Sequence, residues 1–191
     1  VFSSGDEEIL QQIRTAFAST HPVKKQTRAR TWLMSICSKH MYERLSELGG
    51  TKRKSKIITF PCVPKNYLRD FIRGYFDGDG SVFYTDYTST KNHKPRRELR
   101  SNFTSGSRAF LNSLMCILQE EIGLLPKQLG IYNQGSSIKL SYGTYDTHKL
   151  LKFMYYQDHL ISLRRKSCFV QTLPKISLPQ WRNQHTIKIF S

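Results

Sequence analysis

An internal repeat constrains the fold of this chain more than any other feature of the sequence. The pattern F-[ST]-S-G-x-x-x-[IF]-L occurs at residues 2–10 and again at residues 103–111. Two further blocks recur in the same order: WLMSI at residues 32–36 parallels IKLSY at residues 138–142, and an RKS tripeptide with a following T-x-P tripeptide spans residues 53–61 and 165–174. Because three matched blocks in one order are hard to obtain by chance, we interpret the chain as two copies of one structural unit.

The second copy has a complete set of predicted elements. Helical spacing and strand alternation give the order helix, strand, strand, helix, strand, strand, helix, which predicts an α+β fold with antiparallel sheets. Helices are expected at residues 38–48 and 144–156, directly after the second matched block of each copy. We divide the chain into an incomplete first repeat (1–62) that lacks its motif helix and first strand, a complete second repeat (63–174) and a C-terminal tail (175–191).

An acidic motif stands where the first helix of the complete repeat gives way to a strand. The run YLRDFIRGYFDGDGSVFY at residues 67–84 is apolar at helical spacing until it reaches Asp77 and Asp79, which alternate with glycines. Carboxylates at a helix C-terminus are electrostatically unfavourable, because that end of the helix dipole is already negative. The motif therefore predicts a cation, and hard oxygen donors at a helix end suit Mg²⁺.

The charge of the chain indicates a polyanionic partner. The sequence holds 30 Lys and Arg against 14 Asp and Glu, a formal net charge of +16 and a pI near 9.9. Nucleic acid is favoured over an anionic membrane, because the basic residues are interleaved with polar ones and do not stripe one amphipathic helix. The sequence has no apolar segment long enough to predict a membrane-spanning helix. The four separated cysteines, which form no CxxC pair, are interpreted as buried hydrophobes of a reducing, intracellular compartment.

The segment IRGYFDGDG at residues 72–80 resembles the nine-residue motif of the LAGLIDADG homing endonucleases, with Gly74, Asp77, Asp79 and Gly80 at the diagnostic places. The element order, the duplication and the RK ending of each copy also fit that family over roughly residues 2–174. The resemblance implies a duplicated αββαββα homing-endonuclease fold, whose antiparallel sheets form a saddle that binds double-stranded DNA in the major groove.

The resemblance also implies an activity: site-specific, metal-dependent hydrolysis of phosphodiester bonds in both DNA strands by an intron-encoded enzyme. The catalytic residues would be Asp79 and Lys139, and the Mg²⁺ ligands Asp79 and the carbonyl group of Gly78. Asp77 is expected to be structural, accepting backbone donors near the turn. An alternative interpretation of Lys139 stays open: it could be an ordinary phosphate-contacting or solvated lysine without a catalytic role. We align Met34 with Lys139 in the first copy, and this apolar residue predicts asymmetric or weakened chemistry in that half.

A second motif helix is expected against the first. Gly74 and Gly78 lie one turn apart and allow two helix backbones to approach closely, and the predicted interface is Phe71, Gly74, Tyr75 and Gly78. The counterpart of the acidic motif would lie upstream of Val1, and the chain does not begin with Met. Two sources are therefore open: a preceding segment of the same polypeptide, which we favour, or a second chain.

DNA contacts are expected on the polar face of the sheets. By strand alternation, the candidates in the second copy are Ser81, Phe83, Thr85, Tyr87, Arg96, Glu98, Arg100, Asn102, Gln128, Tyr132, Ser137 and Ser141, and those in the first copy are Lys24, Lys25, Arg28 and Arg30. Arg, Asn and Gln can read base edges in the major groove. Residues 88–97 are expected to form a loop between strands that reaches flanking phosphates, with a merely solvated hairpin tip as the alternative. The basic residues of the RKS blocks follow helix ends, where cations complement the helix dipole.

One alternative function stays open from the sequence. The same fold is reused in proteins that bind nucleic acid without cutting it, as DNA-binding regulators or RNA maturases. A single acidic motif and an apolar residue in place of the first-copy lysine both favour such a catalytically impaired protein. The source compartment is equally open between an organelle (mitochondrion or plastid) and the bacterial cytoplasm.

Overall fold

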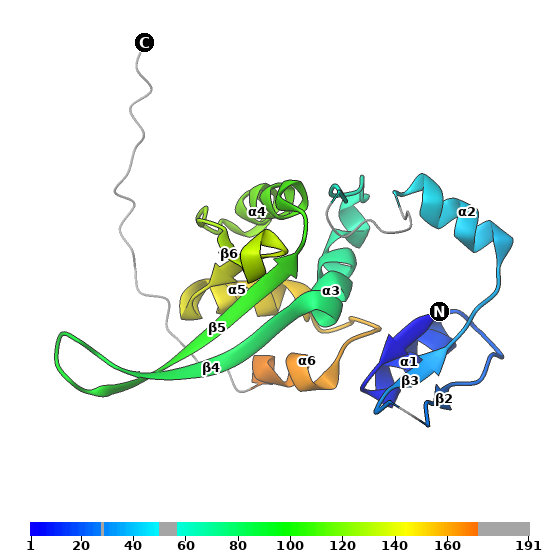
Figure 1. Cartoon of the computed structure of the whole chain (residues 1–191), viewed down its shortest axis with the longest axis horizontal. Coiled ribbons are helices and arrows are strands. Elements are labelled where there is room, and N and C mark those ends of the chain that lie inside the picture. The colour runs from blue at the N-terminus through cyan, green and yellow to red at the C-terminus, as the bar shows by residue number, and fades with distance from the viewer. Residues whose placement is uncertain (28, 50–56, 172–191) are drawn as a thin grey trace, which may run out of the picture.

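The computed structural model describes residues 1–27, 29–49 and 57–171, and α3 lies between the elements of the two repeats (Figure 1). The C-terminal unit contains α3 (Leu68–Asp79), β4 (Gly80–Thr88), β5 (Pro95–Ser105), α4 (Arg108–Ile122), β6 (Gly130–Tyr132), β7 (Ser137–Tyr142), α5 (Thr144–Met154) and α6 (Arg164–Gln171), with short 3₁₀ turns η2 (Lys65–Tyr67) and η3 (Asn133–Gly135). The predicted α+β class and the αββαββα order of the complete repeat are confirmed.

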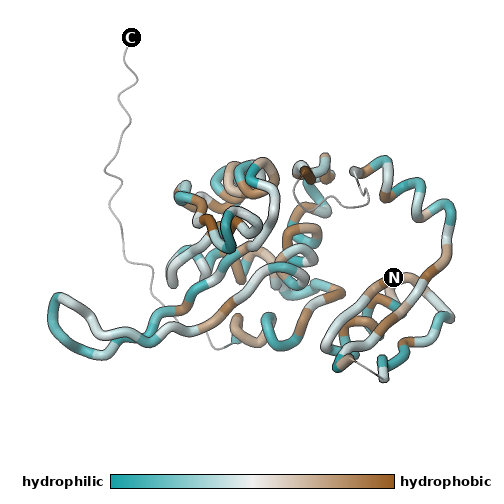
Figure 2. Tube along the Cα trace, in the orientation of Figure 1, coloured by the Kyte–Doolittle hydropathy of each residue, from teal (hydrophilic) through white to brown (hydrophobic). Residues whose placement is uncertain are grey.

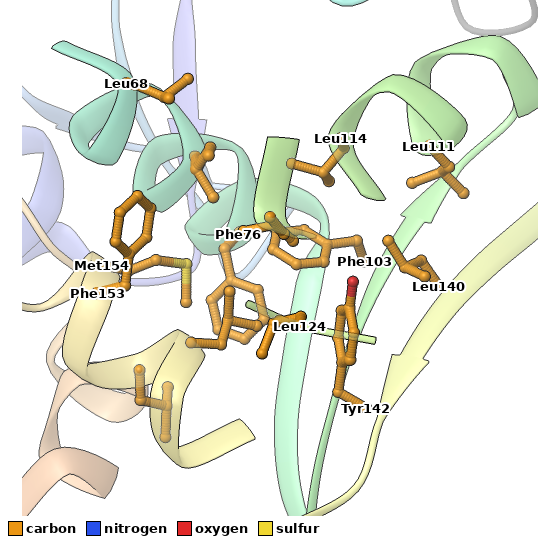
Figure 3. Close-up of a cluster of buried hydrophobic side chains, with 14 of the residues drawn as sticks. Leu68, Phe76, Phe103, Leu111, Leu114, Leu124, Leu140, Tyr142, Phe153 and Met154 are labelled. Atoms are coloured by element: carbon orange, nitrogen blue, oxygen red, sulfur yellow. The ribbon is translucent and has the colours of Figure 1, made fainter. Parts of the chain in front are cut away.

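The four strands of this unit form one antiparallel sheet in the order β4-β5-β7-β6. One face of the sheet is apolar and carries the core, and helices α3, α4 and α5 pack against it. The buried sheet residues that alternate along β5 and β7 are Leu99, Ser101, Phe103, Ile138, Leu140 and Tyr142. Figure 3 shows the side chains of Phe103, Leu140 and Tyr142 meeting Phe76 from α3 and Leu114 from α4.

The N-terminal unit repeats part of this arrangement. It contains β1 (Phe2–Ser4), α1 (Glu7–Ala16), β2 (Lys24–Lys25), β3 (Trp32–Met34) and α2 (Lys39–Glu47). Its sheet order is β1-β3-β2, which corresponds to β5-β7-β6 of the larger sheet. One edge of β1 is therefore unpaired among the described residues, whereas the equivalent edge of β5 pairs with β4.

Strand register corrects the alignment of the two copies around Lys139. Phe2 pairs with Met34 in the N-terminal sheet, and its repeat counterpart Phe103 pairs with Leu140 in the other. Met34 therefore matches Leu140, and both side chains are fully buried. The counterpart of Lys139 is Leu33, so the assignment to Met34 was wrong by one residue. The physical reason is that successive side chains of a strand point to opposite faces, so a shift of one residue exchanges core and surface.

Helix α2 differs from its counterpart α5. Most of α5 is buried, whereas α2 has no buried residue, and Tyr42, Leu45 and Leu48 are more than half exposed. Figure 1 shows α2 standing away from the sheet of its own unit. The apolar face of α2 is thus only partly covered, and Leu45 and Leu48 line a pocket of about 420 Å³ with Val63 and Phe71.

Two further features bear on the sequence analysis. Figure 2 shows a hydrophilic tip on the hairpin that joins β4 and β5, as expected for residues 88–97. All four cysteines are exposed, so their interpretation as buried hydrophobes was wrong. None of the helices in the described residues is long and apolar enough to span a membrane.

Candidate functional site

The site is built at the point where α3 ends and β4 begins. Leu68, Ile72 and Phe76 anchor one face of α3 in the core. At Gly80 the backbone turns to an extended conformation, with φ −92° and ψ 168°. A Cβ atom on this residue would lie 2.3 Å from Cδ2 of Phe76 and 2.7 Å from the Phe76 carbonyl oxygen, so glycine is required for this abrupt change of direction.

Asp77 is directed into the protein. Its carboxylate accepts a hydrogen bond from the Tyr155 hydroxyl at 2.6 Å and from the backbone N–H of Leu163 at 3.0 Å. Burial raises the pKa of the Asp77 carboxyl, and the two hydrogen bonds oppose that shift. The prediction that Asp77 accepts a backbone donor as a structural residue is confirmed.

Asp79 is exposed and lines a cavity of about 680 Å³ together with Tyr75, Thr104, Ser105 and Ser137. Across the cavity lining, the Tyr75 hydroxyl donates to the carbonyl oxygen of Thr104 at 2.6 Å. In the sheet, Thr104 lies directly opposite Lys139. The fold therefore places both predicted catalytic residues at one border, where the tip of α3 meets the polar face of the sheet.

The oxygen ligands at this tip are of the type that Mg²⁺ prefers, namely carboxylate and carbonyl oxygens. Their number is too small to enclose the ion, since the described residues contain no group of three His, Cys, Asp or Glu side chains that could hold a metal ion. Asp79 can supply one carboxylate and Gly78 a backbone oxygen. Any remaining ligands would come from a second motif helix or from DNA.

The four residues of the predicted motif-helix interface differ in exposure. Gly74 and Gly78 are exposed, and a Cβ atom on either would meet nothing within 4 Å. Phe71 and Tyr75 are instead half-buried in their own unit: the Tyr75 ring lies 4.6 Å from that of Phe110, and the Phe71 ring 5.1 Å from that of Phe60. Both also line the cavity of about 680 Å³ beside Gly74 and Asp79, so their contact with a second motif helix stays a prediction.

The open glycine face borders a second cavity of about 620 Å³. Residues of both units line it, including Ile9 and Ile13 of α1, Gly74 and Gly78 of α3, and Leu163. The two units thus leave a partly apolar hollow beside α3.

Strand register places the DNA-binding candidates of the second copy on one face. Directly opposite one another are Ser81 and Asn102, Phe83 and Arg100, Thr85 and Glu98, Tyr87 and Arg96, Asn102 and Ser141, and Tyr132 and Ser137. Thr104 shares this face but was missed by the sequence analysis, although it continues the alternation two residues beyond Asn102. Contact of this face with DNA stays a prediction.

Several of these side chains already have partners. Arg100 donates twice to the Glu98 carboxylate, at 2.9 and 3.1 Å, and the ammonium group of Lys139 lies 4.6 Å from the centre of the Tyr132 ring. Asn102 is only 8% exposed, and its side-chain oxygen accepts a hydrogen bond from Ser81. Asn102 therefore orients the Ser81 side chain.

The remaining candidates lie outside the main sheet. Gln128 is exposed before β6, Lys24 and Lys25 are exposed on β2, and Arg30 is exposed before β3. Arg28 lies outside the described residues. The loop predicted at residues 88–97 is shorter than expected: Thr88 ends β4 and Pro95 begins β5, so residues 89–94 join the two strands at the mostly exposed end of the hairpin.

Lys166 is a feature that the sequence analysis placed incorrectly. The RKS blocks were expected to serve the helices that they follow, but Lys166 lies in α6 and its ammonium group binds the end of α3. The contacts join residues 86 to 90 positions apart, so no local signal could have revealed them.

Comparison with known proteins agrees with this geometry. Residues 66–153 match the family described as LAGLIDADG-like domain. Among solved structures, the chain is similar to the I-LtrWI LAGLIDADG homing endonuclease bound to target DNA, with a TM-score of 0.54 and 10% identity over 90% of this chain and 74% of that one. It is also similar to the meganuclease I-SmaMI bound to uncleaveable DNA (TM-score 0.52, 17% identity, 84% and 73% covered) and to I-SmaMI bound to an uncleaved DNA target in the presence of calcium ions (TM-score 0.53, 14% identity, 84% and 73% covered). No curated protein matches the chain.

The chain has the fold of the homing endonucleases. The family match over residues 66–153 confirms the resemblance predicted from residues 72–80.

Proposed function

We propose that this protein is a site-specific DNA endonuclease that hydrolyses phosphodiester bonds with the help of Mg²⁺ at the Asp79 end of α3. The observation that carries the proposal is the exposed Asp79 carboxylate at the border between the open glycine face of α3 and the polar face of the sheet. The formal charge of +16 supports a polyanionic substrate.

Each part of the site has a role in this proposal. The polar sheet face, with Arg96, Arg100 and Lys139, binds and orients the duplex. Asp79 and the Gly78 carbonyl hold the divalent ion, which when bound activates water and stabilises the leaving oxygen. Lys139 stabilises negative charge on the phosphate that reacts.

A second motif helix completes the site by docking on the face defined by Gly74 and Gly78. Its backbone could approach closely there, because neither glycine faces another residue within reach of a Cβ atom. The apolar face of α2 offers that helix a second contact, as α5 does for α3 in the complete repeat. The unpaired edge of β1 offers a place for its following strand.

We favour a helix covalently joined to this chain over one from a second copy. A second copy would cover α3 with its own α3 and would leave α2 and β1 without partners. Sedimentation of the complex with cleavable DNA tests the choice. One chain per duplex supports a covalently joined helix, and two chains per duplex overturn it.

Cleavage of a DNA library in Mg²⁺ tests the function itself. We expect the protein to cut a defined subset of sequences, and the Asp79→Asn variant to lose cleavage while keeping its affinity for the same sequences. Asp158→Asn is the matched control, because Asp158 is an exposed carboxylate outside the site. Equal cleavage by all three proteins, or by none, contradicts the proposal.

A catalytically impaired nucleic-acid-binding protein, either a DNA-binding regulator or an RNA maturase, is the second candidate. The observation in its favour is Leu33, an apolar residue at the first-copy position of Lys139. Salt-dependent binding of DNA or RNA, with no cleavage and no effect of Asp79→Asn, would establish this function instead.

A further inference from the structure

A buried lysine lies beneath the predicted metal-binding tip of α3. Lys166 is only 3% exposed, and its ammonium group donates to the carbonyl oxygens of Phe76 at 2.6 Å, Asp77 at 2.8 Å and Gly80 at 2.6 Å. The last carbonyl groups of a helix lack intrahelical partners, and that helix end carries partial negative charge. One ammonium group with three donors satisfies three such oxygens at once.

These three acceptors bracket Gly78 and Asp79 in the chain. Phe76 and Asp77 precede the two predicted ligands, and Gly80 follows them. Lys166 therefore fixes the backbone on both sides of the ligands without occupying the exposed side on which Asp79 lies. At neutral pH the lysine keeps its proton, because burial lowers its pKa only to about 8 and the Asp77 carboxylate opposes that shift.

A second connection ties the same helix end to the same region of the chain. The Asp77 carboxylate accepts the backbone N–H of Leu163, and the Leu163 carbonyl accepts the backbone N–H of Lys166. The start of α6 is thus held to α3 both by Asp77 and by Lys166. Two connections that converge on residues 76–80 leave this turn little freedom to rotate.

We propose that Lys166 is a positioning residue that holds the 76–80 turn so that the Asp79 carboxylate and the Gly78 carbonyl face the divalent ion. This inference rests on the proposed function, and it assigns a role in ion binding to a residue that contacts neither the ion nor DNA. Loss of the ammonium group would let the turn relax, so the affinity for the ion would fall even when the fold is retained. Residues that orient metal ligands from behind typically change metal affinity by about 10- to 100-fold when mutated.

Terbium luminescence provides a measurement that does not depend on cleavage. Tb³⁺ prefers oxygen ligands, and Tyr75 lines the same cavity as Asp79 and can sensitise its emission. The signal of the Asp79→Asn variant is subtracted to isolate this site. We expect Lys166→Met to raise the half-saturating Tb³⁺ concentration by about tenfold. The control is Arg164→Met, which removes the same charge from an exposed position of α6 and should leave that concentration unchanged.

The outcomes separate this inference from the proposed function. If the wild-type protein shows no luminescence that depends on Asp79, the metal site fails and the inference falls with it. If that luminescence is present and Lys166→Met binds Tb³⁺ as tightly as wild type, the positioning role alone is overturned.

If Lys166→Met loses its cooperative melting transition, the Lys166→Arg variant is used to test the positioning role instead. The planar guanidinium keeps the charge but cannot converge on three carbonyl oxygens as an ammonium group does. We expect this variant to fold and its half-saturating Tb³⁺ concentration to rise about threefold, less than the usual effect of losing such a residue. Wild-type affinity in folded Lys166→Arg overturns the inference.

Discussion

Asp77 and Asp79 lie two residues apart at the end of α3, yet Asp77 is 5% exposed while Asp79 faces solvent. Two residues along an α-helix differ by about 200° in direction, because each residue advances the helix by about 100°. One carboxylate is thereby bound by Tyr155 and Leu163, and the other is left open at the cavity beside the sheet. The helix geometry therefore directs Asp77 into the core as a structural residue and Asp79 to the surface as a candidate metal ligand.

This separation predicts that two matched substitutions differ in their effect on stability. Asp77→Asn replaces one acceptor oxygen by an amide donor and leaves Tyr155 or Leu163 without an acceptor, so we expect the free energy of unfolding to fall by about 1 to 3 kcal/mol. Asp79→Asn should change it by no more than about 0.5 kcal/mol, as surface substitutions do. Urea unfolding measures both, and equal losses in the two variants would contradict the assignment.

The pH dependence of stability gives a separate test of Asp77. Burial raises the pKa of this carboxyl above its ordinary value of 3.8, so the folded state binds the proton more tightly than the unfolded state. The resulting stabilisation is fully present below pH 3.8 and is lost as the pH rises through the folded-state pKa. We therefore expect the stability advantage of wild type over Asp77→Asn to grow on acidification from pH 7 to below pH 3.8. An advantage that stays constant or shrinks would show that the pKa is not raised.

Gly74 in α3 and Gly80 at the start of β4 should respond in opposite ways to alanine. Gly74 faces open space, so Gly74→Ala should stabilise the helix by about 0.5 to 1 kcal/mol through its higher helix propensity. Gly80→Ala should destabilise the protein by about 1 to 3 kcal/mol, because its Cβ atom would overlap Phe76. Thermal unfolding of the two variants checks the signs. Destabilisation by Gly74→Ala would mean that another segment already covers this face.

The sequence revealed the features that depend on local periodicity. The apolar spacing that ends at Asp77 predicted α3, and the alternation through Arg96, Arg100 and Ser141 predicted which residues share a sheet face. Both follow from fixed side-chain directions in helices and strands. The duplication likewise appears in the matching order of β1-β3-β2 and β5-β7-β6.

Features that depend on distant contacts were missed or left open. Phe71 and Tyr75 contact Phe60 and Phe110, and they also line the cavity beside Asp79. The one-residue error at Met34 did not need the structure to correct it, because the matched blocks at residues 32–36 and 138–142 already align Leu33 with Lys139. The role of Lys166 required knowledge of which helix end would lie beside α6.

Lys139 can be tested as a catalytic residue against its simpler interpretation as a phosphate contact. We expect Lys139→Met to reduce the single-turnover cleavage rate at saturating DNA by about 100-fold, because a positive charge beside the reacting phosphate acts mainly in the transition state. A phosphate contact would instead weaken binding and lower the salt dependence of the affinity by about one unit of slope, with cleavage at saturation unchanged. Lys65→Met is the control, since Lys65 pairs with Glu121 away from the sheet face.

Two buried tyrosines offer a final contrast within the core. The hydroxyl oxygen of Tyr142 has no hydrogen-bond partner among the described residues, and Figure 3 shows it surrounded by the apolar side chains near Phe103 and Leu140. A buried polar group without a partner costs about 1 to 3 kcal/mol, so Tyr142→Phe should raise the free energy of unfolding by about 1 kcal/mol. Tyr155→Phe should lower it by a similar amount, because the Tyr155 hydroxyl donates to Asp77 at 2.6 Å. The two variants remove the same oxygen from equally buried rings, so urea unfolding compares the hydrogen bond alone. A loss of stability in Tyr142→Phe would show that its hydroxyl has a partner, such as an internal water molecule.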